Sequence, residues 1–367
     1  MNPSLDRKHI ILLVGLAIAL SFTRSCQFNS PGTSTSGEKP VVQATLSYEK
    51  PDWVDVYFSE PDNPQSQTLR GGPDKYLADA IRRARVSVDI AVLNLDLWSI
   101  RDALMDAHRR GVSVRLVTDS DYLDQPEIKD LIKAGIPILS DRREGLMHNK
   151  FVIIDRQEVW TGSMNLTING VYRNDNHLIR IQSTQLAKNY TAEFEEMYLH
   201  DLFGPGSPNQ TPHPTFTING IQIENYFSPD DQTEARLIEL IQSAQESIYF
   251  LAYSFTSDPI ADAMLERAAD GVLVTGVFES SQYRSNAGTE FDRFTAAGLD
   301  MRLDGNPKNM HHKVIIIDQK VVVAGSYNYS FYAETRNDEN TLILHDPLIA
   351  SLFEQEFRRV FEQGSQP

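Results

Sequence analysis

The chain has 367 residues, 41% hydrophobic and 23% charged, which is enough for two domains of about 150 residues each. Its formal net charge of −16 at pH 7 argues against a dedicated DNA- or RNA-binding protein, which would present a basic face, although a local basic pocket stays compatible. A single cysteine, Cys26, excludes an intrachain disulfide, so the fold must rest on its hydrophobic core.

The first 26 residues have the pattern of an export signal. Arg7 and Lys8 precede an apolar run at 10–22, which is shorter than the roughly 20 residues of a membrane-spanning helix. Residues 1–26 therefore predict a signal peptide or an N-terminal membrane anchor. We expect the protein to be exported or membrane-anchored, in a bacterial-type periplasm or at the cell surface.

The fate of this segment stays open between cleavage, retention and lipid modification at Cys26. Bacterial lipoproteins usually carry Leu three residues before the modified cysteine, where this chain has Thr23. Residues 27–50 are rich in Ser, Thr, Gly and Pro and show no hydrophobic period, so they predict a flexible linker.

Strands alternate with helices in the first folded unit, 51–202. A strand is expected at 54–58, followed by a helix at 77–84, where apolar residues recur at helical spacing. Further elements, alternately strand and helix, are predicted at 86–92, 100–110, 112–117 and 127–134, with a closing helix at 186–199. This alternation indicates a layered α/β fold.

Residues 203–220 interrupt the pattern with two Pro-rich clusters, Gly-Pro-Gly-Ser-Pro and Thr-Pro-His-Pro. This stretch is predicted to be a linker. The second unit, 221–363, repeats the plan of the first. Its helices are predicted at 237–244, 259–270, 291–297 and 348–361, and its strands at 247–253 and 272–278.

One short string occurs twice. Residues 147–155 read Met-His-Asn-Lys-Phe-Val-Ile-Ile-Asp, and residues 310–318 read Met-His-His-Lys-Val-Ile-Ile-Ile-Asp. Gly-Ser-x-Asn follows each copy, at 162–165 and at 325–328. Two copies in register indicate a duplicated unit and predict one site built from both halves.

In each copy, the His and the Lys two residues later point to the same face of the strand, because side chains alternate along it. These residues are His148 and Lys150 in the first copy and His311 and Lys313 in the second. Asp155 and Asp318 lie an odd number of residues from their histidines. The alternation therefore places them on the opposite face, where they would support the architecture.

The combined inventory suits an anion. Besides the His and Lys pairs, the candidate phosphate-binding donors are Ser163, Asn165, Ser326 and Asn328. Two lysines would repel a metal cation, whereas a phosphoryl group takes positive charge and neutral donors on its oxygens. We therefore expect no metal and no cofactor.

Two histidines can supply the reaction. One unprotonated imidazole can attack phosphorus while the other, protonated, gives its proton to the leaving oxygen. The second imidazole then deprotonates a water that cleaves the phosphohistidine. Imidazole suits both roles because its pKa lies near neutrality.

These two segments resemble the His-x-Lys-x4-Asp motifs of the phospholipase D superfamily, and with Gly-Ser-x-Asn the resemblance covers most of residues 50–363. It implies two α/β/α sandwich halves related by a pseudo-twofold axis, with the active site at their interface and a phosphohistidine intermediate. The catalytic residues that it implies are His148, Lys150, Asp155, His311, Lys313 and Asp318.

The two halves differ at one position. Members of this superfamily often carry a Glu after Gly-Ser-x-Asn that orients the motif histidine; Glu339 fits this role, whereas the first half has Asn176. The first-half histidine is usually the nucleophile, which favours His148. Glu339, however, would be expected to stabilise a cationic His311, so the identity of the nucleophile stays open.

The expected function is a phospholipase D-type phosphodiesterase that hydrolyses phospholipid head-group esters. The alternatives are an endonuclease of the same superfamily, acting on DNA or RNA, and a cardiolipin synthase-like phosphatidyltransferase. The expected partner is accordingly a phospholipid or membrane surface, with nucleic acid as the alternative. Since both motifs lie in one chain, a monomer suffices to complete the site.

Overall fold

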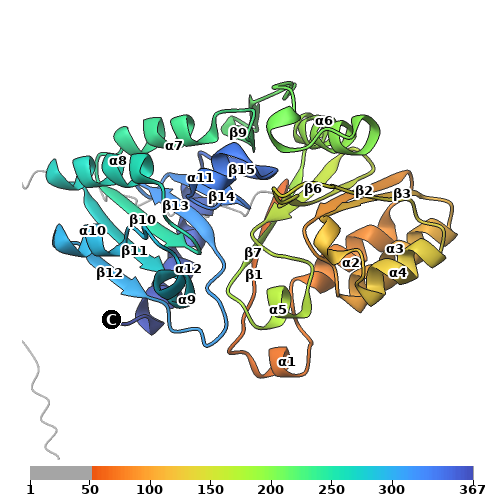
Figure 1. Cartoon of the computed structure of the whole chain (residues 1–367), viewed down its shortest axis with the longest axis horizontal. Coiled ribbons are helices and arrows are strands. Elements are labelled where there is room, and N and C mark those ends of the chain that lie inside the picture. The colour runs from red at the N-terminus through yellow and green to blue at the C-terminus, as the bar shows by residue number, and fades with distance from the viewer. Residues whose placement is uncertain (1–51, 367) are drawn as a thin grey trace, which may run out of the picture. The chain divides into compact units, whose positions relative to one another are not determined.

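A computed structural model describes residues 52–366 (Figure 1). The export segment expected at 1–26 and the linker expected at 27–50 lie outside the described residues. Lys50–Pro367 cluster as one unit that contains both copies of the motif. Within the described part of the chain, no helix is long and apolar enough to cross a bilayer.

The first half forms a seven-stranded sheet in the order β1-β7-β6-β5-β2-β3-β4. Strands β2, β3 and β4 are parallel, and the remaining pairs are antiparallel. The elements are β1 (Val54–Phe58), α1 (Pro64–Gln67), α2 (Asp74–Arg83), β2 (Ser87–Val92), α3 (Trp98–Arg109), β3 (Ser113–Thr118), η1 (Ser120–Tyr122), α4 (Pro126–Lys133), β4 (Ile138–Ser140), β5 (Lys150–Ile154), β6 (Glu158–Gly162), α5 (Ile168–Tyr172), β7 (His177–Gln182) and α6 (Thr184–His200).

The second half forms an eight-stranded sheet in the order β12-β11-β10-β13-β14-β15-β9-β8. After the short turn η2 (Gly204–Gly206), its elements are β8 (Thr215–Ile218), β9 (Ile221–Ser228), α7 (Thr233–Gln242), β10 (Ser247–Ala252), α8 (Asp258–Ala269), β11 (Leu273–Phe278), α9 (Ser280–Ser285), α10 (Phe291–Ala296), β12 (Asp300–Leu303), β13 (Lys313–Ile317), β14 (Val321–Gly325), α11 (Phe331–Thr335), β15 (Glu339–Leu344) and α12 (Pro347–Gln363).

The predicted α/β class and the two similar halves are confirmed. The linker expected at 203–220 is partly wrong, because β8 lies within it and pairs with β9 along the edge of the second sheet. Thr215–Ile218 alternates polar and apolar residues, with Phe216 buried. The Pro-rich residues just before it concealed this short strand.

The motif strands occupy the centre of each sheet and are buried on both faces, which explains their uninterrupted apolar runs. In β5, Phe151 and Ile153 enter one hydrophobic core while Val152 and Ile154 enter another. Strand β13 divides its side chains in the same way. Each motif is therefore held rigidly by packing on two sides.

Three hydrophobic cores organise the unit. One contains side chains of α2, α3 and α4 against the first sheet, and another those of α7, α8 and α10 against the second. The third is shared, because α6 and α12 and strands of both sheets contribute to it. This shared core fixes the halves against each other, and the site between them depends on it.

Candidate active site

Two short backbone pairings cross between the halves and build the site. Met147 pairs with Asp338, and Asp175 pairs with Met310, both as isolated parallel bridges. The amide of His148 donates to the carbonyl of Asp338 at 3.0 Å, and that of the second motif histidine donates to Asp175 at 2.9 Å. Met147, just before the first motif histidine, therefore lies beside the segment of the second half that contains Glu339. Met310, just before the second motif histidine, lies beside the segment of the first half that contains Asn176.

As a result, Glu339 orients the histidine of the other half. Its Oε2 lies 2.7 Å from Nδ1 of His148, and both side chains are buried. The expectation that Glu339 would stabilise His311 is wrong, because the crossed pairing carries β15 toward the first motif. The histidine expected to be the nucleophile is thus also the one that contacts a carboxylate.

His311 contacts neutral acceptors instead. Its Nδ1 lies 2.9 Å from Oδ1 of Asn176 and 3.1 Å from the carbonyl oxygen of Ser163. Since both partners only accept, Nδ1 of His311 must carry a hydrogen. The same holds for His148 opposite Glu339, so Nε2 is left in each ring for chemistry.

Both motif lysines fold back onto the motif backbone. Nζ of Lys150 donates to the carbonyl of His148 at 2.7 Å, and Nζ of Lys313 donates to that of His311 at 2.9 Å. Lys313 also lies 4.5 Å from the ring centroid of Tyr253, which packs edge-on against His311. Each ammonium group has three donors, so two remain for an anion.

Burial and mutual repulsion shift the titration of this cluster. Burial lowers the pKa of His148 to about 4, although Glu339 acts to raise it. Burial, and then the charges of Lys313 and Lys150, lower the pKa of His311 well below its ordinary value. The pKa of Lys150 falls to about 7, again through burial. The site is therefore poised to gain positive charge when an anion enters.

The two predicted serine ligands have another role. Ser163 donates its hydroxyl hydrogen to Oδ1 of Asn176 at 2.8 Å, and Ser326 donates to Oε2 of Glu339 at 2.6 Å. Each hydroxyl oxygen also accepts a backbone N–H, from His177 and from Asn340 respectively. A hydroxyl has one hydrogen to give, so neither serine has a donor left for phosphate. They hold the residues that orient the histidines.

Asn165 and Asn328 remain available for a ligand. Both are half-buried, and among the described residues neither side-chain amide makes a hydrogen bond. Their Oδ1 atoms are buried without a partner, and because a phosphate oxygen only accepts, the Nδ2 groups are the donors that a phosphate would use. The expected phosphate-binding set thus reduces to these two amides and the two lysines.

The glycine before each serine is required by close backbone approach. A Cβ atom at Gly162 would lie 2.3 Å from the carbonyl oxygen of His177, and one at Gly325 would lie 2.2 Å from that of Asn340. Only glycine permits this approach, which brings β6 and β14 against the residues that follow Asn176 and Glu339.

The two motif aspartates lie outside the site. Asp155 accepts from the backbone amides at 85–87, and Asp318 from those at 245–247, at distances of 2.7 to 3.1 Å. Each aspartate lies seven positions after its histidine, which is roughly 23 Å along a nearly extended chain. They anchor the start of β2 and β10, which corrects the catalytic role implied by motif membership.

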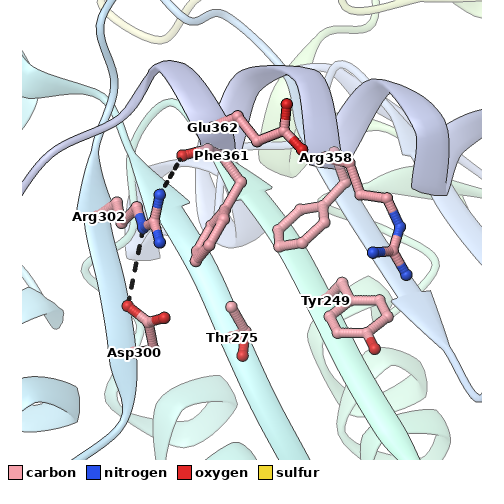
Figure 2. Close-up of a pocket in the computed structure, with 8 residues that line it drawn as sticks. Tyr249, Thr275, Asp300, Arg302, Arg358, Phe361 and Glu362 are labelled. Carbon is pink, nitrogen blue, oxygen red and sulfur yellow. Dashed lines mark hydrogen bonds and ion pairs between the residues drawn. The ribbon is translucent and has the colours of Figure 1, made fainter. Parts of the chain in front are cut away.

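An open cavity of about 360 Å³ lies elsewhere, between β10, β11, β12 and α12, and none of the motif residues lines it (Figure 2). In it, Arg302 lies 3.7 Å from the ring centroid of Phe361. The equivalent position in the first half is filled by Arg115, which pairs with Asp89. The second half has Thr275 in place of that arginine, so its cavity stays open.

No three His, Cys, Asp or Glu side chains converge as metal ligands would within residues 52–366.

Comparisons with known proteins agree with this geometry. A family profile described as "Cardiolipin synthase, PLD-like domain" matches residues 77–198 and 237–361. The mitochondrial cardiolipin hydrolase of Chlamydomonas reinhardtii is 32% identical over 136 residues, which are 37% of this chain and 60% of that protein. The phospholipase D of Rickettsia bellii is 31% identical over 195 residues, which are 52% of this chain and 92% of that protein.

The match thus spans about 60% of the length of the algal relative. Among solved structures, phosphatidylserine synthase of Haemophilus influenzae superposes with a TM-score of 0.61 at 15% identity, covering 83% of this chain and 86% of that one. At this identity the likeness concerns the fold alone.

Proposed function

The chain belongs to the phospholipase D superfamily, and from this premise we propose that it hydrolyses phospholipid head-group esters through a covalent phosphohistidine. The observation that carries the proposal is the crossed orientation of the two histidines. Each presents Nδ1–H to the opposite half, which leaves both Nε2 atoms free, and the charges of Lys150 and Lys313 act on both rings.

His148 is the better nucleophile. Attack through Nε2 makes its ring cationic, and the carboxylate of Glu339, 2.7 Å from Nδ1, offsets that charge. His311 faces the neutral amide of Asn176, which does not stabilise a cation as a carboxylate would. His311 therefore gives up a proton more readily, as a general acid must.

The proposed reaction has two steps. Nε2 of His148 attacks phosphorus, the bond from phosphorus to the leaving oxygen breaks, and protonated His311 donates its Nε2 proton to that oxygen. His311 then takes a proton from water, whose oxygen attacks phosphorus and releases His148. Lys150, Lys313 and the two free asparagines would bind the phosphoryl oxygens and offset their charge.

The names of the relatives support a phospholipid substrate, because they include cardiolipin hydrolases and phospholipases D. The description of the family profile favours a second candidate, phosphatidyl transfer, in which an alcohol replaces water in the second step. We also propose that the protein is exported or anchored through residues 1–26. Fractionation of expressing cells would test this, and recovery of unprocessed chain in the cytosol would contradict it.

The decisive assay offers the full-length chain three substrates with EDTA present: cardiolipin vesicles, phosphatidylcholine vesicles and single-stranded DNA. We expect release of the lipid head group and no DNA cleavage. With phosphatidylcholine vesicles, added glycerol separates the two candidates, since hydrolysis gives phosphatidic acid whereas a phosphatidyltransferase would form phosphatidylglycerol. The His148→Asn variant is the control and should be inactive on every substrate. DNA cleavage alone would instead identify a nuclease, and loss of all activity in EDTA would refute the metal-free mechanism.

A further inference from the structure

Asn94, in the loop that follows β2, has a side-chain amide with no hydrogen-bond partner within residues 52–366. The residue is half-buried, and its Oδ1 is buried whereas its Nδ2 is not. The two amides assigned above to the phosphoryl group, Asn165 and Asn328, have the same arrangement. Asn94 therefore presents a free N–H donor of the kind that those two residues offer.

The register of β2 places this amide beside the first motif histidine. Strand β2 pairs antiparallel with β5, and Val92 stands opposite Lys150. Continuation of this register by two residues places Asn94 opposite His148. Side chains that stand opposite each other across an antiparallel pair project from the same face, about 5 Å apart at Cβ. Asn94, His148 and Lys150 therefore share one face of the first sheet.

Contacts of the loop hold Asn94 next to the Gly-Ser-x-Asn segment. Leu95 pairs with Leu166 as an isolated parallel bridge, and the amide of Asp96 donates to the carbonyl of Leu166 at 3.1 Å. The residues just before this bridge, Asn94 and Asn165, are thus neighbours. Asp96 has a structural task, because its carboxylate accepts from the first amide of α5 at 2.6 Å. The side chain of Asn94 makes no such bond within the described part of the chain.

The second half differs at the corresponding position. Strand β10 pairs with β13, and the same continuation of the register places Ser254 opposite His311. The amide of Tyr253 donates to the carbonyl of His312 at 2.9 Å, which shows that this pairing continues past the end of β10. The hydroxyl oxygen of Ser254 accepts from Nδ2 of Asn286 at 3.0 Å. A free amide therefore stands beside the first motif histidine and not beside the second.

We propose that Asn94 is a further substrate-binding residue, which donates from Nδ2 to a phosphoryl oxygen on the side of His148. Phosphoryl oxygens only accept hydrogen bonds and carry negative charge, so a neutral N–H donor suits them. With Asn165 beside it, Asn94 places two adjacent amide donors next to the nucleophile. Its role toward a diester rests on the proposed function, whereas its role as an anion donor does not.

The state of the amide also separates a binding role from a structural one. A buried polar atom without a partner costs stability, and Oδ1 of Asn94 is such an atom. Replacement by alanine removes that atom and breaks no hydrogen bond of the folded chain. The urea midpoint of Asn94→Ala should therefore stay the same or rise, while its affinity for an anion falls. A lower midpoint with unchanged affinity would make Asn94 a structural residue and overturn the proposal.

The test measures binding of inorganic phosphate to the full-length chain by ³¹P NMR titration at about pH 6, where Lys150 is charged. In Asn94→Ala, Kd should rise about 10- to 100-fold, the range for one hydrogen bond to a charged group. In Asn94→Asp, which keeps the size and shape, Kd should rise further because the carboxylate repels the anion. An unchanged Kd in Asn94→Ala, tighter binding by Asn94→Asp than by Asn94→Ala, or no phosphate binding by the wild-type protein would each overturn the proposal.

Ser254→Ala is the matched control from the second half. It removes a hydroxyl that Asn286 already occupies, so Kd for phosphate should change less than about threefold. Equal losses of affinity in Asn94→Ala and Ser254→Ala would contradict the assignment of the donor to the first half.

Turnover separates this inference from the proposed function. With bis(p-nitrophenyl) phosphate, Asn94→Ala should lower kcat/KM by about the factor by which it raises Kd for phosphate. If the wild-type protein turns over no phosphodiester, the proposed function fails while the phosphate titration still decides the role of Asn94. If the wild-type protein is active and Asn94→Ala changes neither quantity, the inference alone fails.

Discussion

Substitution of Glu339 by Gln tests which histidine forms the covalent bond. The change keeps the shape of the side chain and an oxygen that can accept from Nδ1 of His148, and removes only the negative charge. A phosphorylated His148 would then carry its positive charge in a buried site with no carboxylate at 2.7 Å.

The size of the effect follows from the geometry. Two unit charges about 4 Å apart interact by about 4 kcal/mol at an effective dielectric constant of about 20, the value suited to such sites. The amide of Gln recovers a neutral hydrogen bond worth about 1 kcal/mol. The remaining loss of about 3 kcal/mol corresponds to a rate about 10²-fold slower in forming the intermediate.

Single-turnover kinetics with bis(p-nitrophenyl) phosphate would measure this step, with the phosphorylated peptide identified by mass spectrometry after an alkaline quench. Asn176→Asp is the matched variant, because it places a carboxylate beside His311 at almost unchanged volume. If His311 were the nucleophile, Asn176→Asp would accelerate the burst and Glu339→Gln would change it less than threefold. That pair of results would refute the assignment of His148.

Three further predictions concern charge and backbone. Burial lowers the pKa of Lys150 to about 7, so its amine loses its charge above that pH. KM for an anionic diester should therefore rise between about pH 6 and 9. The rise should be smaller in the variant Lys150→Arg, because the guanidinium keeps its charge. Three backbone amides lower the pKa of Asp318, although burial acts to raise it. The ionised carboxylate therefore stabilises the folded protein fully at pH values above its pKa in the unfolded chain. This stabilisation is lost as the pH falls through the lower pKa of the folded protein. Asp318→Asn should therefore cost about 1–2 kcal/mol in urea unfolding at pH 7, and a difference that persisted undiminished at pH 2 would contradict this. Gly325→Ala brings Cβ to 2.2 Å from the carbonyl of Asn340 and should destabilise the fold by at least about 2 kcal/mol, whereas Gly206→Ala, with open space around it, should change stability little.

The sequence predicted most of the fold because periodicity reports burial directly. The eight predicted helices lie within a few residues of α2, α3, α4, α6, α7, α8, α10 and α12, whereas the short helices α1, α5, α9 and α11 were not predicted. The apolar strands β1, β2, β3, β10 and β11 also lie within a few residues of their predicted ranges. Strands β7 and β15 were missed because they begin on His177 and on Glu339-Asn340-Thr341, polar residues that interrupt the alternation typical of strands. Their polar ends are buried because they form the interface.

The sequence predicts which residues make up the candidate site, but it does not predict which of them contact one another. Duplicated spacing identifies the histidines and lysines. Yet His148 and Glu339 are 191 residues apart, and their contact depends on the pairing of Met147 with Asp338, which no local pattern encodes. The serines were misassigned for the same reason, since a Ser beside Gly looks free until the partner strand is in place.

The crossed pairing between the halves also bears on how such a site can evolve. A homodimer of one half would place the same residue next to both imidazoles, because any substitution would appear twice. Fusion into one chain lifts that constraint, so one copy can keep a carboxylate at 339 while the other carries an amide at 176. Each ring can then specialise, one for bonding to phosphorus and the other for moving protons. Neither half remains self-sufficient once that division of labour is established.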